Sequence, residues 1–134
     1  MSKAKILIVE DNLMNLELVS DVLEAHGYEV LQADTGRKAL EIAGREQPEL
    51  VLMDIQLPEM DGLEVTRLLK EDERTSHISV IALTAHAMRG DEERAREAGC
   101  SGYIAKPINT REFAGVIADF LAESRGDPGG KVEE

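Results

Sequence analysis

Five short apolar segments, set at intervals along the chain, constrain the fold more than any other feature of the sequence. Most are rich in Ile, Val and Leu, and they are apolar throughout rather than alternating with polar residues. This pattern is typical of strands that are covered on both faces, as in a parallel sheet. The segments are residues 6–9, 29–33, 50–53, 80–83 and 102–105.

The stretches between these segments have the period of helices. In the last stretch, apolar residues recur on one helical face, at Phe113, Val116, Ile117, Phe120 and Leu121. The first stretch is apolar over a wide arc, which predicts a well-buried helix. Its apolar residues are Leu16, Leu18, Val19, Val22 and Leu23.

Residues that favour helix ends support the same division. Asp61, with Glu64 three residues later, is typical of a helix start, and Asp34-Thr35 is expected to cap the second helix. Gly27 and Gly99 lie where the first and fourth helices are expected to end. Strand and helix therefore alternate five times, which predicts a doubly wound α/β sandwich.

Length and composition predict one domain. The 134 residues match about one domain of ordinary size, and we expect it to occupy residues 1–122. Residues 123–134 are rich in Gly and charged residues, which predicts a disordered tail and no separate output domain. Cys100 is the only cysteine, so an internal disulfide is excluded. We interpret Cys100 as a small buried side chain.

Charge excludes two classes of partner. The formal net charge is −12, whereas nucleic-acid binding and docking on anionic membranes need a basic face. The sequence also has no apolar stretch long enough for a signal peptide or a membrane span. With a lone cysteine that fits a reducing compartment, these features predict a cytoplasmic protein.

Polar side chains follow the predicted strands where a parallel sheet binds its ligands, outside the carboxyl ends of the strands. Glu10 and Asp11 follow the first strand, and Asp54 follows the third. Thr84 ends the fourth strand, and Lys106 ends the fifth. The sequence therefore predicts that three carboxylates, a hydroxyl and an ammonium group converge at one edge of the sheet.

The charges of this group suggest its chemistry. Glu10, Asp11 and Asp54 contribute −3 and Lys106 contributes +1, so a net −2 needs compensation. A bound Mg²⁺ brings the sum to zero, and a metal that also holds phosphate oxygens makes a phosphoryl-transfer site. Asp54 is then the nucleophile that accepts the phosphoryl group. Lys106 and the Thr84 hydroxyl neutralise and bind its oxygens.

These motifs resemble the receiver domains of two-component response regulators. The resemblance covers residues 4–122 and rests on four motifs at matching mutual spacing: VEDN at 9–12, MDIQLPEMDG at 53–62, LTA at 83–85 and YIAKP at 103–107. It implies a CheY-like five-stranded parallel sheet of order 2-1-3-4-5. It also implies Mg²⁺-dependent phosphoryl transfer to Asp54 from a sensor histidine kinase or a histidine phosphotransfer protein.

The resemblance also assigns roles to single residues. It implies that Mg²⁺, or Mn²⁺ in its place, is held by Asp11, Asp54 and the backbone carbonyl of Gln56, with Glu10 acting through water. Lys106 binds the phosphoryl group, and Thr84 and Tyr103 form a switch pair. Lys106-Pro107 has two interpretations: a simple turn before the last helix, or a cis bond that aims the lysine back toward the site.

Further residues narrow the resemblance to single-domain regulators of the DivK type and to the receivers of hybrid kinases. They include EDNLMN at 10–15, GLEVT at 62–66 and TAHAM at 84–88. This implies phosphorylation-dependent protein contacts, with kinases as the regulated partners and the fourth helix, fifth strand and fifth helix as the contact face. The alternative is a phosphorelay shuttle that passes the group to a histidine phosphotransfer protein.

Two other functions fit the sequence less well. A phosphatase of the haloacid-dehalogenase type needs a second acid two residues after the nucleophile, where this chain has Gln56. A flavodoxin-like cofactor binder needs a loop rich in Ser, Thr and Gly after the first strand, where this chain has residues 11–14, DNLM. We therefore expect a phosphoacceptor switch rather than an enzyme with a separate substrate.

Overall fold

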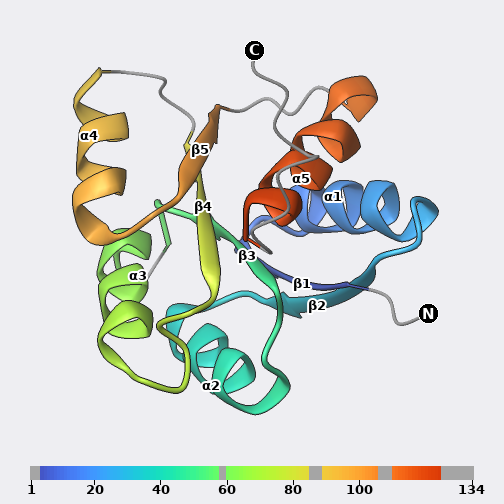
Figure 1. The fold of residues 1–134 in the computed structure, drawn as a ribbon. Coiled ribbons are helices and arrows are strands. Elements are labelled where there is room, and N and C mark those ends of the chain that lie inside the picture. Colours follow the sequence, from blue (N-terminus) through green and yellow to red (C-terminus); the bar gives the residue numbers. More distant parts are fainter. Residues whose placement is uncertain (1–3, 58–59, 85–88, 106–109, 125–134) are drawn as a thin grey trace.

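The computed structural model describes residues 4–57, 60–84, 89–105 and 110–124, without the side chains of 89–92, 110 and 124. Strands and helices alternate through these described residues (Figure 1). The strands are β1 (Lys5–Val9), β2 (Glu29–Ala33), β3 (Leu50–Asp54), β4 (Ser79–Thr84) and β5 (Gly102–Ala105). The helices are α1 (Leu13–Ala25), α2 (Gly36–Glu46), α3 (Gly62–Glu71), α4 (Arg89–Ala98) and α5 (Thr110–Ser124).

The strands form one parallel sheet of order β2-β1-β3-β4-β5, so the predicted fold and strand order are confirmed. Helices α1 and α5 cover one face of the sheet, and α2, α3 and α4 cover the other (Figure 1). Each face has its own apolar core. The central strands β1, β3 and β4 are buried almost throughout, which explains why they lack polar alternation.

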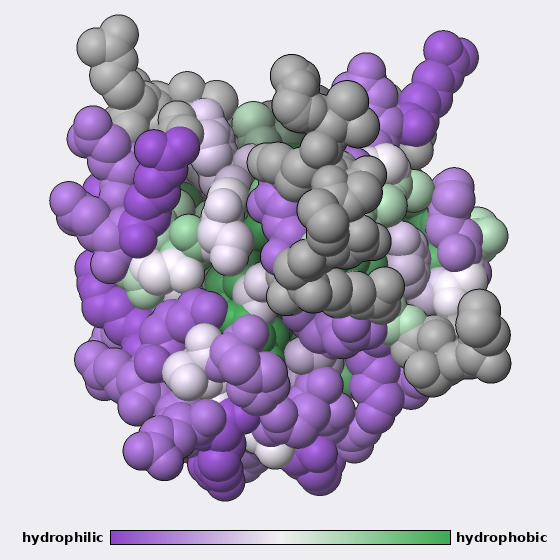
Figure 2. Space-filling model, viewed as in Figure 1, coloured by the Kyte–Doolittle hydropathy of each residue, from purple (hydrophilic) through white to green (hydrophobic). Residues whose placement is uncertain are grey.

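The surface around these cores is mostly hydrophilic in the view of Figure 2, as expected from the many charged residues.

The predicted helix ends are confirmed by their hydrogen bonds. Thr35 caps α2 and Asp61 caps α3, each through a side-chain oxygen that accepts a backbone N–H of the first turn. Gly27 and Gly99, just beyond α1 and α4, have φ values of 90° and 111°. Only glycine adopts this backbone region at low cost, so both helices end where their glycines allow.

Strands β1, β3 and β4 extend beyond the predicted apolar segments. Lys5, Asp54, Ser79 and Thr84 join them because the backbone pairs with the neighbouring strand whatever the side chain. Helix α5 continues to Ser124, two residues past the predicted end of the domain at residue 122. Residues 125–134 lie outside the described residues, so the predicted domain boundary stays a prediction. None of the described helices is long and apolar enough to cross a membrane.

The prediction that α1 is buried over a wide arc is wrong. Leu18 is 44% exposed, and Leu13 and Met14 at the start of the helix are 68% and 80% exposed. The sheet and α5 cover only one stripe of α1, and within it a polar residue, Ser20, takes a buried position. The Ser20 hydroxyl accepts a hydrogen bond from Nε2 of Gln32 on β2 at 2.7 Å, which satisfies it.

This difference along α1 predicts unequal effects of the same substitution. Leu23 is fully buried, so Leu23→Ala should lower the free energy of unfolding by about 2–5 kcal/mol. Leu18→Ala removes the same atoms from an exposed position and should change it by less than about 0.5 kcal/mol. Urea unfolding of the two variants measures both values. Equal losses would contradict the packing of α1.

The small-side-chain interpretation of Cys100 is confirmed. The residue is 8% exposed and belongs to the core that α2, α3 and α4 cover. Burial raises the pKa of its thiol, since the charged thiolate is disfavoured away from water. At physiological pH the thiol is therefore a neutral packing group.

Candidate functional site

The candidate site lies at the carboxyl ends of β1, β3 and β4, which are neighbours in the middle of the sheet. The chain passes from β1 to β2 on one side and then crosses to β3 on the other, so the strand order reverses between β1 and β3. Glu10 and Asp11 directly follow β1, and Asp54 is the last residue of β3. Ligands of open parallel sheets bind at such a point.

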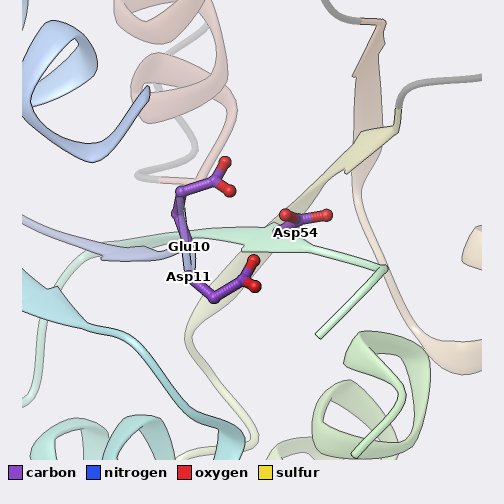
Figure 3. Close-up of side chains that lie close together, drawn as sticks. All are labelled: Glu10, Asp11 and Asp54. Carbon is purple, nitrogen blue, oxygen red and sulfur yellow. The ribbon is translucent and has the colours of Figure 1, made fainter. Parts of the chain in front are cut away.

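Three carboxylates meet there. One oxygen of each of Glu10, Asp11 and Asp54 can be chosen so that all lie within 4.8 Å of one another. Figure 3 shows Glu10 and Asp11 extending from the end of β1 toward the space beside Asp54. Glu10 and Asp54 are 3% and 4% exposed, whereas Asp11 is exposed. The predicted convergence of the carboxylates is therefore present in the folded chain.

Backbone hydrogen bonds fix the two buried carboxylates. Oδ1 of Asp54 accepts the N–H of Gln56 at 2.9 Å, and Oε2 of Glu10 accepts the N–H of Asn12 at 3.2 Å. The peptide N–H groups at the ends of β1 and β3 also bond across the sheet, from Glu10 to Ala33 and from Ile55 to Leu83. These hydrogen bonds hold the Glu10 and Asp54 carboxylates in place, although the like charges of the two groups repel one another.

The loop after β3 connects the site to α3. Gln56, whose carbonyl is a predicted metal ligand, lies in this loop beside Asp54. At the far end of the loop, Oδ1 of Asp61 accepts the N–H of Leu63 at 2.9 Å, and the N–H of Gly62 reaches the carbonyl of Ile55 at 3.2 Å. Oδ2 of Asp61 also lies 3.7 Å from the Arg94 guanidinium of α4.

Sequence reasoning missed this contact between Gly62 and the Asp54 loop. From the sequence, Gly62 is interpretable only as part of a helix start. The sequence did contain one indication of this contact, because a glycine in a helix lowers its stability relative to most other residues. A glycine there indicates that something approaches the backbone closely.

The remaining predicted residues are only partly described. Thr84 ends β4 at 2% exposure, and the residue before it, Leu83, is the register partner of Asp54. Tyr103 is half-buried on the edge strand β5, where it pairs with Ala82. Lys106 and Pro107 lie outside the described residues, so the ammonium group and the possible cis bond stay predictions.

The site suits a hard divalent cation. All three side chains offer carboxylate oxygens, which Mg²⁺ prefers, and Mg²⁺ typically takes one or two carboxylates with several waters. Two of the carboxylates are buried, so a cation there would offset repulsion that water screens poorly. The residues present therefore fit the predicted metal.

The chain belongs to the response regulator receiver domain family, whose model matches residues 6–118. Receiver domains act as phosphoacceptor switches in two-component signalling and bind Mg²⁺ at an acidic pocket. Among its relatives is the polar-differentiation response regulator DivK of Brucella ovis, which is 51% identical over 119 residues. That match covers 89% of this chain and 97% of the relative.

Two solved structures bear on the site. The receiver domain of the sensor histidine kinase PA1611 from Pseudomonas aeruginosa, with a magnesium ion in its active-site cleft, is 34% identical with a TM-score of 0.80. The match covers 93% of this chain and 99% of that one. A co-crystal structure from Saccharomyces cerevisiae, of the receiver domain of Ssk1 with the histidine phosphotransfer protein Ypd1, matches at 27% identity and a TM-score of 0.83. That match covers 91% of this chain and 92% of the other.

Proposed function

We propose that this chain is a single-domain response regulator that accepts a phosphoryl group on Asp54 from a histidine kinase or a phosphotransfer protein. The observation that carries the proposal is the convergence of Glu10, Asp11 and Asp54 within 4.8 Å where the strand order reverses. The match along 97% of the DivK relative supports the single-domain interpretation. Incubation with acetyl phosphate and Mg²⁺, followed by intact-mass measurement, tests it through the gain of one phosphoryl group.

The transfer needs one bond to form and one to break. A carboxylate oxygen of Asp54 attacks the phosphorus, and the phosphorus–nitrogen bond of the donor phosphohistidine breaks. The electron pair of that bond returns to the ring nitrogen, and the donor, already protonated on its other ring nitrogen, leaves as neutral imidazole. Asp11, Asp54 and the carbonyl of Gln56 would hold Mg²⁺, with Glu10 acting through water and Mn²⁺ as a substitute. Bound there, the cation would neutralise charge that develops on the phosphoryl oxygens.

Two further residues are proposed to bind the phosphoryl group. The Thr84 hydroxyl, buried at the end of β4, would donate to a phosphoryl oxygen at the neighbouring end of β3. Lys106, which follows β5, would contribute the compensating positive charge. Replacing the carboxylate by an acyl phosphate adds about one negative charge, which we propose draws Thr84 and Tyr103 into a second arrangement.

We propose that the phosphorylated chain signals through protein contacts on the α4–β5–α5 face. Tyr103 on β5 is half-buried, so its ring can change exposure without unfolding the core. The proposed role is regulation of kinases, as the resemblance of the sequence to regulators of the DivK type implies. We still predict that the protein is located in the cytoplasm. We also predict that it acts as a phosphoacceptor switch rather than as an enzyme with a separate substrate.

A phosphorelay shuttle is the alternative within the same class. The similarity to the Ssk1 receiver, which was solved with a histidine phosphotransfer protein, favours it. A shuttle returns its phosphoryl group to a histidine faster than the group hydrolyses, whereas a regulator of kinases keeps it. The phosphoryl lifetime with and without a phosphotransfer protein distinguishes the two roles.

We propose that the start of α1 is the docking surface for the phosphoryl donor. Its exposed apolar residues begin with Leu13 and Met14, two and three positions after Asp11, and Leu18 lies one helical turn beyond Met14. The double substitution Met14→Ala, Leu18→Ala should slow transfer from a histidine kinase about tenfold or more, since it removes apolar anchor groups. Phosphorylation rates with the kinase and with acetyl phosphate measure the effect.

The small donor is the matched control for this prediction. Acetyl phosphate needs no docking surface, so its reaction with the double variant should keep the rate of the unaltered chain. Equal slowing with both donors would contradict the docking surface and indicate damage to the site itself.

A further inference from the structure

The first turn of α3 lies directly against the backbone of the proposed phosphoacceptor. A Cβ atom added at Gly62 would lie 2.2 Å from the carbonyl oxygen of Asp54, 2.9 Å from its carbonyl carbon and 2.7 Å from the Cα of Ile55. All three are backbone atoms, so no side-chain rotation could relieve the overlap. The backbone of Asp54 holds its present place only because residue 62 has no side chain.

Two other glycines show how specific this contact is. A Cβ at Gly36, at the start of α2, would lie 2.6 Å from Cγ2 of Val65 and 3.2 Å from Sδ of Met60, which are both side-chain atoms. A Cβ at Gly115 on α5 would meet nothing within 4 Å. The three positions therefore differ in kind: Gly62 borders the site backbone, Gly36 borders side chains, and Gly115 is open.

Hydrogen bonds anchor both sides of the contact. The N–H of Gly62 donates to the carbonyl of Ile55 at 3.2 Å, and Oγ1 of the fully buried Thr66 donates to the carbonyl of Gly62 at 2.9 Å. Gln56 in turn donates its N–H to Oδ1 of Asp54. The helix start, the loop and the carboxylate are thus joined through consecutive short contacts.

We propose that Gly62 is a positioning residue that sets the place of the Asp54 carboxylate and the Gln56 carbonyl for metal binding and phosphoryl acceptance. The inference rests on the proposed function of Asp54. Relieving the overlap to 3.0 Å moves α3 and the Asp54 backbone apart by about 0.8 Å, across the very loop that carries Gln56. A misplacement of about 1 Å can slow a reaction about 100-fold.

The test compares Gly62→Ala, Gly36→Ala and Gly115→Ala with the unaltered chain, well below their melting temperatures. Two quantities are measured: the Mg²⁺ dissociation constant, from titration of backbone amide resonances, and the rate of phosphorylation by acetyl phosphate at saturating Mg²⁺. We expect Gly62→Ala to bind Mg²⁺ about tenfold more weakly and to react about 100-fold more slowly. Gly36→Ala should melt at a lower temperature yet keep both quantities. Gly115→Ala should also keep both, and it should melt at a slightly higher temperature because alanine favours the helix.

A fall in melting temperature alone, with Mg²⁺ binding and phosphorylation retained in Gly62→Ala, would overturn the inference and make Gly62 a packing residue. Equal losses in Gly36→Ala would overturn it as well, because any disturbance of α3 would then suffice. If the unaltered chain neither binds Mg²⁺ nor gains a phosphoryl group, the proposed function itself is wrong. The inference about Gly62 depends on that function and is then wrong as well.

If Gly62→Ala does not fold, a measurement on the unaltered chain tests the inference instead. Mg²⁺ held by Asp54 and the Gln56 carbonyl would tighten the loop to which the Gly62 N–H bonds. Hydrogen exchange of that N–H should therefore slow on addition of Mg²⁺, while exchange of the Gly115 N–H should not change. An unchanged rate at Gly62 in a chain that binds Mg²⁺ would overturn the inference.

Discussion

Asp54→Asn should abolish the gain of a phosphoryl group from acetyl phosphate. The amide has nearly the shape of the carboxylate and can keep the hydrogen bond from the Gln56 N–H, but its oxygen is a far weaker nucleophile. The fold should survive, because removing one of three clustered negative charges relieves repulsion. Intact-mass measurement after incubation with acetyl phosphate and Mg²⁺ gives the result directly.

Asp34→Asn is the matched control. Asp34 follows β2 at the same edge of the sheet, but it lies outside the carboxylate cluster and forms an exposed ion pair with Lys38 at 3.0 Å. This variant should take up one phosphoryl group as the unaltered chain does. Phosphorylation that persists in Asp54→Asn would refute the assignment of the phosphoacceptor.

Asp11→Asn should weaken Mg²⁺ binding by at least about tenfold. Removing a group that only hydrogen-bonds to a metal ligand typically lowers the affinity for the metal about 10–100-fold. Asp11 is proposed as a direct ligand, so its loss should cost at least as much. The same change should raise the melting temperature of the metal-free chain, because it removes one of three close negative charges. The stabilisation that Mg²⁺ adds should shrink. Melting temperatures with Mg²⁺ and with a chelator measure both effects.

Asp21→Asn separates the local effect from the effect of net charge. Asp21 is exposed on α1 and lies outside the carboxylate cluster, yet its substitution changes the net charge by the same amount. It should leave the Mg²⁺-dependent rise in melting temperature unchanged. If both variants lose this rise equally, Mg²⁺ stabilises the chain through general screening rather than at the proposed site.

The sheet was predictable because its signal is local and repeated. Buried parallel strands must be apolar throughout, so β1, β3 and β4 are recognisable one by one. The order of the strands is a different matter, because apolar segments alone do not say which strands are neighbours. Only the family resemblance predicts that order.

The carboxylate cluster was predictable for a geometric reason. Parallel strands end at one edge of the sheet, so residues just after β1 and β3 must lie near one another once those strands pair. The contact of Gly62 with Asp54 depends instead on how closely α3 approaches the sheet. That distance is set by packing over many residues, so a glycine at the helix start indicates a close approach but does not identify Asp54 as the neighbour.

The exposure of Leu18 shows a limit of periodicity. Periodicity shows that α1 has an apolar arc, but the width that is covered depends on what packs against it. Here the covered stripe ends before Leu18, which leaves an apolar surface exposed. The structure, rather than periodicity, therefore shows which apolar residues of a helix are exposed and can form a contact surface.

Locating the acyl phosphate on the chain tests the role of Asp54 most directly. The chain is incubated with acetyl phosphate and Mg²⁺, reduced with borohydride so that an acyl phosphate becomes a homoserine residue, digested and sequenced by mass spectrometry. We expect homoserine at position 54, and none in a parallel sample treated with chelator. Homoserine at another acidic residue would contradict the proposed phosphoacceptor, and homoserine at position 54 irrespective of Mg²⁺ would contradict the proposed metal dependence.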